Sequence, residues 1–162
     1  MFAAASEEHR WLQQLVGDWT YEVHAQMGPD KPEEVFHGKE HVRGLGELWV
    51  VCEGEGEMPD GDSMQTLMTL GFDPARGHFL GSWAGSMMTH MWIYDGGLDE
   101  ARRVLTLDTT GPDFSPDAQP GATARYQDII ELTGENTRTL RSQMLGADGQ
   151  WHQFMLAEYK RV

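Results

Sequence analysis

The sequence predicts an all-β protein: a single antiparallel up-and-down β-barrel of about ten strands, preceded by a short N-terminal helix. Apolar and polar residues alternate with a period of two through most of the chain, which is typical of strands with one buried face. Gly, Pro and Asp residues interrupt this alternation at short intervals, which permits hairpins and excludes βαβ crossovers. Sequentially paired strands leave two open edges, and closure into a barrel removes both; a β-sandwich is the alternative.

A single helical pattern lies at the N-terminus. Ser6 is a suitable N-cap residue, and Glu7 and Glu8 follow it in the first turn, where acidic side chains complement the helix dipole. Gly17 is expected to end the helix. The apolar stripe of the helix is expected to comprise Phe2, Trp11, Leu12 and Leu15.

Ten strand-like runs follow the helix, and turn residues separate them. The triplet Asp95-Gly96-Gly97 is expected to form the turn after the sixth run, and the longest connection extends from Gly111 to Ala122. Glycines inside the runs, such as Gly38 and Gly56, are expected to mark bends or bulges. The runs are Asp18–Met27, Glu34–Arg43, Glu47–Glu57, Ser63–Phe72, His78–Ser86, Thr89–Tyr94, Arg103–Thr109, Thr123–Leu132, Arg138–Leu145 and Gln150–Arg161.

The composition favours one domain in a reducing compartment. The 162 residues fit a single domain, with residues 1–16 as the helix that closes the barrel and residues 17–162 as the barrel itself. A formal net charge of −14, without clustered Lys or Arg residues, argues against nucleic acid and membrane surfaces as partners. Cys52 is the only cysteine, and the chain has no leader-like start and no long apolar run, so a cytoplasmic location is expected.

Two groups of residues carry a resemblance to known families. Gly17-Asp18-Trp19 after a short helix, together with Arg161 near the C-terminus, resembles the calycin barrels, which include lipocalins and fatty-acid-binding proteins. The chain from Leu15 onward resembles more specifically an uncharacterised bacterial family, domain of unknown function 1579 (DUF1579), although Gly85 stands where that family frequently has Asp. This resemblance implies a calycin-like barrel and no established activity. The segments that carry it are Leu15–Trp19, Leu70–Pro74, Gly81–Met87 and Tyr159–Arg161.

The alternation also predicts which side chains face the barrel interior, once one residue of a run is anchored. With Trp19 pointing inward, the interior combines aromatic and methionine side chains with a few polar groups, which is the usual composition of a small-molecule pocket. Gln153 is assigned to the interior, whereas Phe154 and Leu156 are assigned to the outer face of the last run, which predicts a bulge or an oligomer contact there. The residues expected to bind a ligand are Tyr21, Met68, His90, Trp92, Tyr94, Tyr126, Asp128, Met155 and Arg161.

The leading hypothesis is a non-catalytic protein that binds a small, largely apolar molecule in the barrel lumen, with His90 or Arg161 as a polar anchor. For Arg161 the alternative role is structural, because a guanidinium stacked on Trp19 closes one end of the barrel. Two alternative functions stay open. One is an enzyme that acts on a small organic substrate through His90 and Asp128. The other is a solidly packed barrel that forms a homodimer through the outer face of its last strand.

No metal or cofactor is predicted. His37 and His41 share one strand face, but four residues span ~13 Å along a strand, which is too far to bind one ion without a third ligand. Haem bound through His90 is an alternative, by analogy with bacterial calycins that use one barrel histidine. The sequence has no Gly-x-Ser-x-Gly elbow, and Cys52 lies in an apolar run where a thiol is unreactive.

Overall fold

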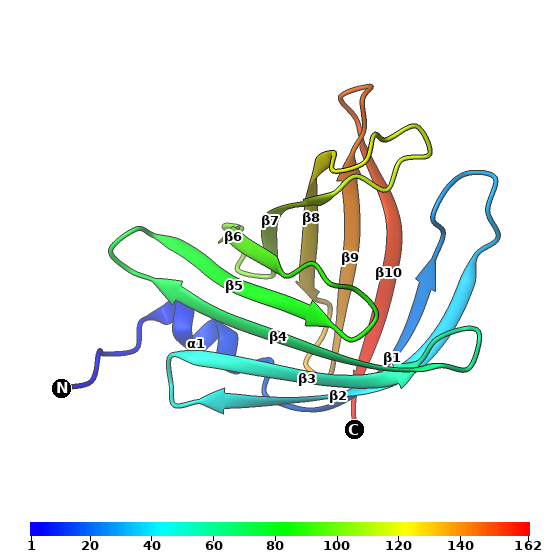
Figure 1. Cartoon of the computed structure of the whole chain (residues 1–162). Helices are drawn as coiled ribbons and strands as arrows, with labels where there is room; N and C mark the ends of the chain where they lie inside the picture. The colour runs from blue at the N-terminus through cyan, green and yellow to red at the C-terminus, as the bar shows by residue number, and fades with distance from the viewer.

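The computed structural model describes all 162 residues, and it consists of one helix and ten strands that close into an antiparallel barrel (Figure 1). The elements are α1 (Glu7–Gln13), β1 (Gly17–Ala25), β2 (Glu34–Leu45), β3 (Trp49–Glu57), β4 (Ser63–Asp73), β5 (His78–Gly85), β6 (Trp92–Leu98), β7 (Val104–Pro112), β8 (Thr123–Leu132), β9 (Thr137–Leu145) and β10 (Trp151–Arg161). Each strand pairs with the next one in sequence, and β1 pairs with β10 to complete the ring. The predicted fold class is therefore confirmed.

The sixth strand is the one whose predicted position was wrong. The sequence placed it at residues 89–94, whereas β6 covers residues 92–98, so the triplet Asp95-Gly96-Gly97 lies inside the strand and pairs with β7. The turn comes later, at Asp99, whose Oδ1 accepts a hydrogen bond from the Arg103 N–H at 2.8 Å. An aspartate side chain that accepts hydrogen bonds from backbone N–H groups later in the chain can form a turn without glycine. The sequence-based prediction placed the turn at Gly96-Gly97 and therefore missed the turn at Asp99.

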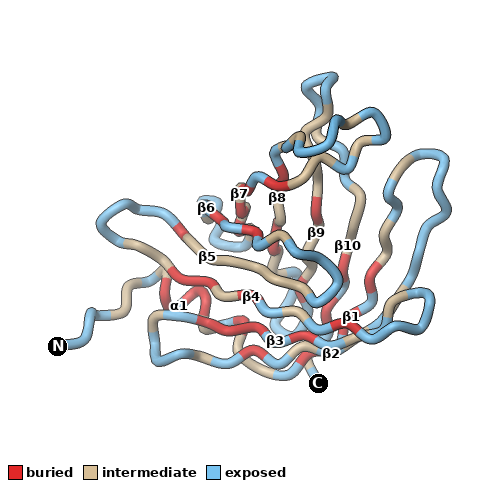
Figure 2. The backbone as a smooth tube through the Cα atoms, viewed as in Figure 1, coloured by how far each residue is buried: buried red, intermediate tan, exposed pale blue.

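Helix α1 packs beside β3 and β4 (Figure 1). The Trp11 indole N–H donates to the carbonyl of Arg102 at 2.7 Å, and the His9 ring lies 3.0 Å from the carbonyl oxygen of Phe72. Figure 2 shows buried backbone gathered along α1 and the neighbouring strands. Phe2 is fully exposed, so its predicted place in the apolar stripe was wrong, because the helix begins only at Glu7. No helix here has the length and apolar character needed to cross a bilayer.

The start of β1 and the end of β10 are joined by a stacked pair of side chains. Trp19 lies in the core, and the Arg161 guanidinium lies 4.2 Å from the centroid of its ring. The same guanidinium donates to the carbonyls of Val16 at 2.6 Å and Gln14 at 3.0 Å. Gly17 has a φ of +144°, and a Cβ there would lie 2.3 Å from Arg161 Nη1, so only glycine fits at this position. The Gly-x-Trp motif and the terminal Arg thus form one unit.

Replacement of Arg161 by Met is expected to lower the free energy of unfolding by about 2 kcal/mol, because it removes two charge-assisted hydrogen bonds and the contact with Trp19. Lys160→Met is the matched control, since Lys160 is the preceding residue but is exposed. Urea unfolding of both variants measures the difference. An R161M protein as stable as the wild type would show that closure at this end does not depend on the guanidinium.

Strand β10 contains the one shift of register in the barrel. The pairing with β9 slips between Gln153 and Met155, so that Phe154 is an extra residue in a β-bulge. As a result Phe154 and Met155 both face the interior, whereas Gln153 is exposed. The predicted interior position of Gln153 and outer position of Phe154 were therefore wrong. The homodimer expected from an outer face with Phe154 and Leu156 stays a prediction, but Leu156 is the only one of these two residues on that face.

Gly38 and Gly56 make room for an aromatic ring and do not mark bulges. At Gly38 and Gly56 the register is regular, so neither position has the expected bulge. A Cβ at Gly38 would lie 2.2 Å from the Tyr21 hydroxyl oxygen, and a Cβ at Gly56 would lie 2.7 Å from it. Tyr21 therefore crosses the inner faces of β2 and β3 only because both positions lack side chains.

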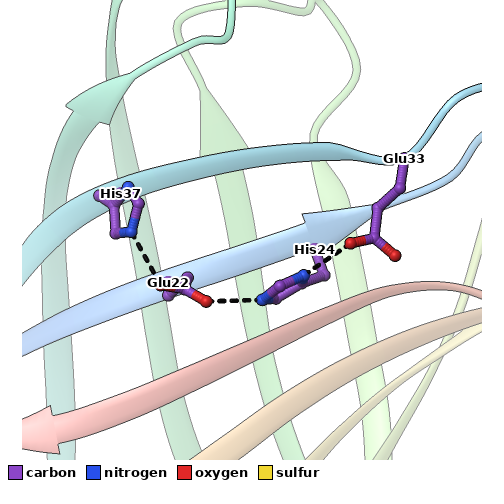
Figure 3. Close-up of polar contacts among 4 residues, drawn as sticks. All are labelled: Glu22, His24, Glu33 and His37. Atoms are coloured by element: carbon purple, nitrogen blue, oxygen red, sulfur yellow. Dashed lines mark hydrogen bonds and ion pairs between the residues drawn. The ribbon is translucent and has the colours of Figure 1, made fainter.

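The outer face of β1 and β2 carries a chain of imidazole and carboxylate groups (Figure 3). Glu22 contacts His24 at 2.7 Å and His37 at 2.8 Å, and the second ring nitrogen of His24 lies 2.8 Å from Glu33. Hydrogen bonds to Glu33 and Glu22 raise the pKa of His24, and hydrogen bonds from His37 and His24 lower the pKa of Glu22. The four side chains connect the last part of β1 to the segment before β2.

The stability that His24 contributes is expected to depend on pH. A raised pKa in the folded protein means that this contribution is complete below about pH 6.5, the ordinary pKa of histidine, and is lost as the pH rises through the raised value. The wild type should therefore exceed His24→Gln in free energy of unfolding more at about pH 6 than at about pH 9. His90→Gln, at a histidine with no carboxylate partner, is the control for urea unfolding. A difference between wild type and H24Q that stays constant with pH contradicts the prediction.

Candidate ligand-binding cavity

The barrel interior is hollow. It contains a cavity of about 420 Å³, and 22 of the 29 residues that line it are apolar. This volume falls within the range of about 300–1,000 Å³ that is typical of small-molecule sites. Met27, Met87, Met88 and Phe114 line the cavity and are also exposed, so they lie at its mouth. Leu15, which is fully buried just after α1, lines the opposite end.

The structure brings most of the predicted ligand-binding residues to this cavity. Tyr21 projects from β1, Met68 from β4 and Trp92 from β6, and their burial agrees with an inward orientation. They alternate with exposed neighbours along each strand, which is the pattern that predicted them. The six predicted residues that line the cavity are Tyr21, Met68, Trp92, Tyr126, Asp128 and Met155.

Three predicted residues do not line the cavity. His90 lies in the loop before β6 and contacts the carbonyl oxygen of Thr110 at 3.2 Å, beside a surface hollow formed by the β7–β8 connection. The alternation did not extend to it because the strand starts two residues later. Tyr94 is buried in the barrel but does not line the cavity, and its hydroxyl donates to Asp128, which does. Arg161 lies at the closed end, in the structural role described above. His90 and Asp128, the pair expected for catalysis, are thus not brought together.

Asp128 is the most unusual polar residue of the cavity wall. Its Oδ2 accepts a hydrogen bond from the Tyr94 hydroxyl at 2.5 Å, and its Oδ1 accepts one from the Ser142 hydroxyl at 2.5 Å. Burial raises the pKa of Asp128, while the two hydrogen bonds act in the opposite direction. Burial and the adjacent Asp128 also raise the pKa of Tyr94 well above its ordinary value. No cationic side chain forms an ion pair with this carboxyl group.

Arg138 and Glu40 form a buried ion pair that the sequence did not indicate. Arg138 Nη2 lies 2.5 Å from Glu40 Oε1, and the two side chains are 4% and 11% exposed. The guanidinium also lies 3.8 Å from the centroid of the Tyr159 ring and 4.7 Å from that of Trp19. Both charged residues line the cavity. The one available signal was the alternation along β9, which places Arg138 on the same face of the strand as the apolar Leu140.

Replacement of Arg138 by Met alone is expected to reduce the free energy of unfolding by about 3–5 kcal/mol, because it leaves Glu40 buried without a partner. The double variant Glu40→Leu/Arg138→Met should recover most of this loss, since it removes both charges. Lys39→Leu/Glu55→Leu, at an exposed pair, is the control and should change stability by less than about 1 kcal/mol. Urea unfolding of the single and double variants gives the coupling energy. A double variant whose losses simply add would contradict the prediction.

The other hollows of the surface have a different character. Two of them lie on the outer face of β1 to β5 and are lined mainly by polar and charged residues, including Lys39 and Glu55. No group of three or more His, Cys, Asp and Glu side chains has the geometry to hold a metal ion. Burial raises the pKa of the Cys52 thiol, which opposes formation of a nucleophilic thiolate. The lumen is therefore the site with the composition of a small-molecule pocket.

Residues 4–161 match the model of a family described as a protein of unknown function, DUF1579. The chain belongs to the DUF1579 family. The match includes every strand of the barrel and all the residues that line the cavity. The family assignment inferred from the sequence is confirmed. No curated protein shows significant similarity to this DUF1579 protein.

Solved structures with the same fold are distant in sequence. Rv2717c from M. tuberculosis has a TM-score of 0.62 and 12% identity, with 98% of this chain and 99% of the other covered. The S-type phycobiliprotein lyase CPES from Guillardia theta has a TM-score of 0.62 and 13% identity, with 98% and 93% covered. A redesigned β-barrel, mFAP0, bound to DFHBI, has a TM-score of 0.50 and 11% identity, with 92% and 100% covered. At these identities the likeness shows the fold alone.

Proposed function

We propose that this DUF1579 protein binds a small, largely apolar molecule in the barrel lumen. The observation that carries the proposal is the apolar cavity of about 420 Å³ inside the closed ring of strands. A solidly packed barrel would leave no such volume, since protein interiors are normally filled to crystal-like density. The likeness to a designed barrel bound to DFHBI supports the idea that this architecture accommodates an organic ligand.

The side chains at the mouth support entry of ligands with varied shapes. Met27, Met87 and Met88 are exposed there, although exposure of large apolar side chains has a cost in water. Unbranched thioethers repack around different ligands at small energetic cost, which makes methionine common at adaptable binding surfaces. We propose that residues 1–16 close the opposite end, so that a ligand enters past these methionines.

Two buried polar groups of the cavity wall also support a ligand. The Thr109 hydroxyl and Arg138 Nε belong to residues that line the cavity, and neither has a hydrogen-bond partner in the protein. Buried polar groups are nearly always hydrogen-bonded, so we propose that these two side chains turn toward the lumen when a molecule with an acceptor binds there. We place this binding in the bacterial cytoplasm, where the single Cys52 thiol stays reduced.

Met155→Trp is expected to weaken binding of the neutral apolar dye prodan about tenfold or more, because the larger ring fills part of the cavity. Leu156→Trp is the matched control, since Leu156 pairs with His24 on the outer face and does not line the cavity. Fluorescence titration measures dye affinity, and native mass spectrometry of fresh protein identifies any molecule that co-purifies. The proposal fails if prodan does not bind to the folded wild type, or if both variants bind it equally well.

A further inference from the structure

We infer that the ligand carries an amine, and that its N–H groups donate to the Asp128 carboxyl in the middle of the cavity wall. This inference rests on the proposed function and names the chemical class of the molecule bound in the same cavity. It also predicts that molecules of the same shape with a carboxylate in place of the amine are rejected. Three features of the cavity carry it: the position of Asp128, its free acceptor capacity, and the balance of charge.

The position of Asp128 makes its carboxyl available to a ligand. Asp128 follows Tyr126 on the inner face of β8, and Ser142 lies opposite it on β9. The residue lies deep within the barrel and still lines the cavity, so the accessible part of its side chain faces the lumen. The apolar residues near it cannot solvate a carboxylate.

The carboxyl group has more acceptor sites than its protein partners use. An ionised carboxylate offers about four lone-pair sites. Tyr94 and Ser142 each donate one hydrogen bond, to different oxygens, and no other side chain or backbone N–H contacts the group. An ammonium or amine at this point would donate to the remaining sites and supply the missing positive charge, which makes a charge-assisted hydrogen bond in a poorly solvated site.

The charges in the cavity favour a cation and oppose an anion. Arg138, the cation that lines it, is 2.5 Å from Glu40, so its charge is already balanced. Asp128 and the exposed Glu34 are the other acidic residues of the lining, and neither forms an ion pair, so a ligand carboxylate would meet uncompensated negative charge without a free cation to receive it. The net charge of −14 also attracts cations to the protein and repels anions from it.

Four probes with one adamantane skeleton test the inference by displacement of prodan: 1-adamantylamine, 1-adamantanol, adamantane-1-carboxylate and N,N,N-trimethyl-1-adamantylammonium. The wild type is expected to bind the amine about tenfold more tightly than the alcohol, and the carboxylate most weakly. The trimethylammonium probe keeps the charge but has no N–H, so it should lose the advantage of the amine. This comparison uses the wild-type protein and does not depend on whether a variant folds.

Asp128→Asn is expected to bind amine and alcohol with similar affinity, because the neutral amide oxygen accepts a hydrogen bond from either group but forms no ion pair with an ammonium. Asp108→Asn is the matched control: Asp108 lies on β7, accepts from Gln127 at 2.8 Å outside the cavity, and its loss changes the net charge equally. A tenfold preference that persists in D128N, or its absence from the wild type while the alcohol binds, overturns the inference and leaves the proposed function intact. Failure of every probe and of prodan itself to bind the folded wild type overturns both.

Discussion

The pairing of β1 with β10 is the constraint on which the rest of the molecule depends. It begins with Trp19 opposite Arg161 and continues to Ala25 opposite Met155. Without this ladder the sheet would have two open edges, and its inner face would be exposed to water. With it, aromatic, methionine and polar side chains share one interior. There burial raises the pKa of Asp128, and Arg138 contacts Glu40. The cavity is thus a consequence of closure.

Much of this interior could be predicted because strand geometry is regular. One anchored residue, Trp19, correctly orients Tyr21, and the same parity brings Tyr126 and Asp128 to the inner face of β8. Parity holds only along an uninterrupted ladder, however. It failed at His90, which precedes its strand, and at Gln153, which precedes the bulge at Phe154. The apolar residues that the alternation left on the outer face of the last run did indicate a bulge or an oligomer contact there, but they did not identify Phe154 as the extra residue.

The Glu40–Arg138 pair shows a different limit. Charged residues in strands usually face water, and the alternation of Arg138 with Leu140 was the one local sign that Arg138 faces inward. The two are 98 positions apart and meet only across the closed barrel. Tyr159 and Trp19, on the strands between them, contact the guanidinium from the ring faces. The environment of Arg138 is therefore a property of the whole ring of strands, which local pattern and composition do not contain.

The polar groups of the cavity wall lie at different distances from its mouth, so a bound ligand has a preferred orientation. Along β9 the chain runs from Arg138 near the closed end, through Leu140, to Ser142 opposite Asp128, while the exposed methionines lie at the mouth. The ion pair at the bottom is already balanced, so it offers little gain to a charged group that must give up its hydration to reach it. Asp128 is nearer the mouth and has hydroxyl partners only. A ligand with one polar end therefore gains most when that end stops at mid-depth and its apolar part contacts the surrounding rings and thioethers.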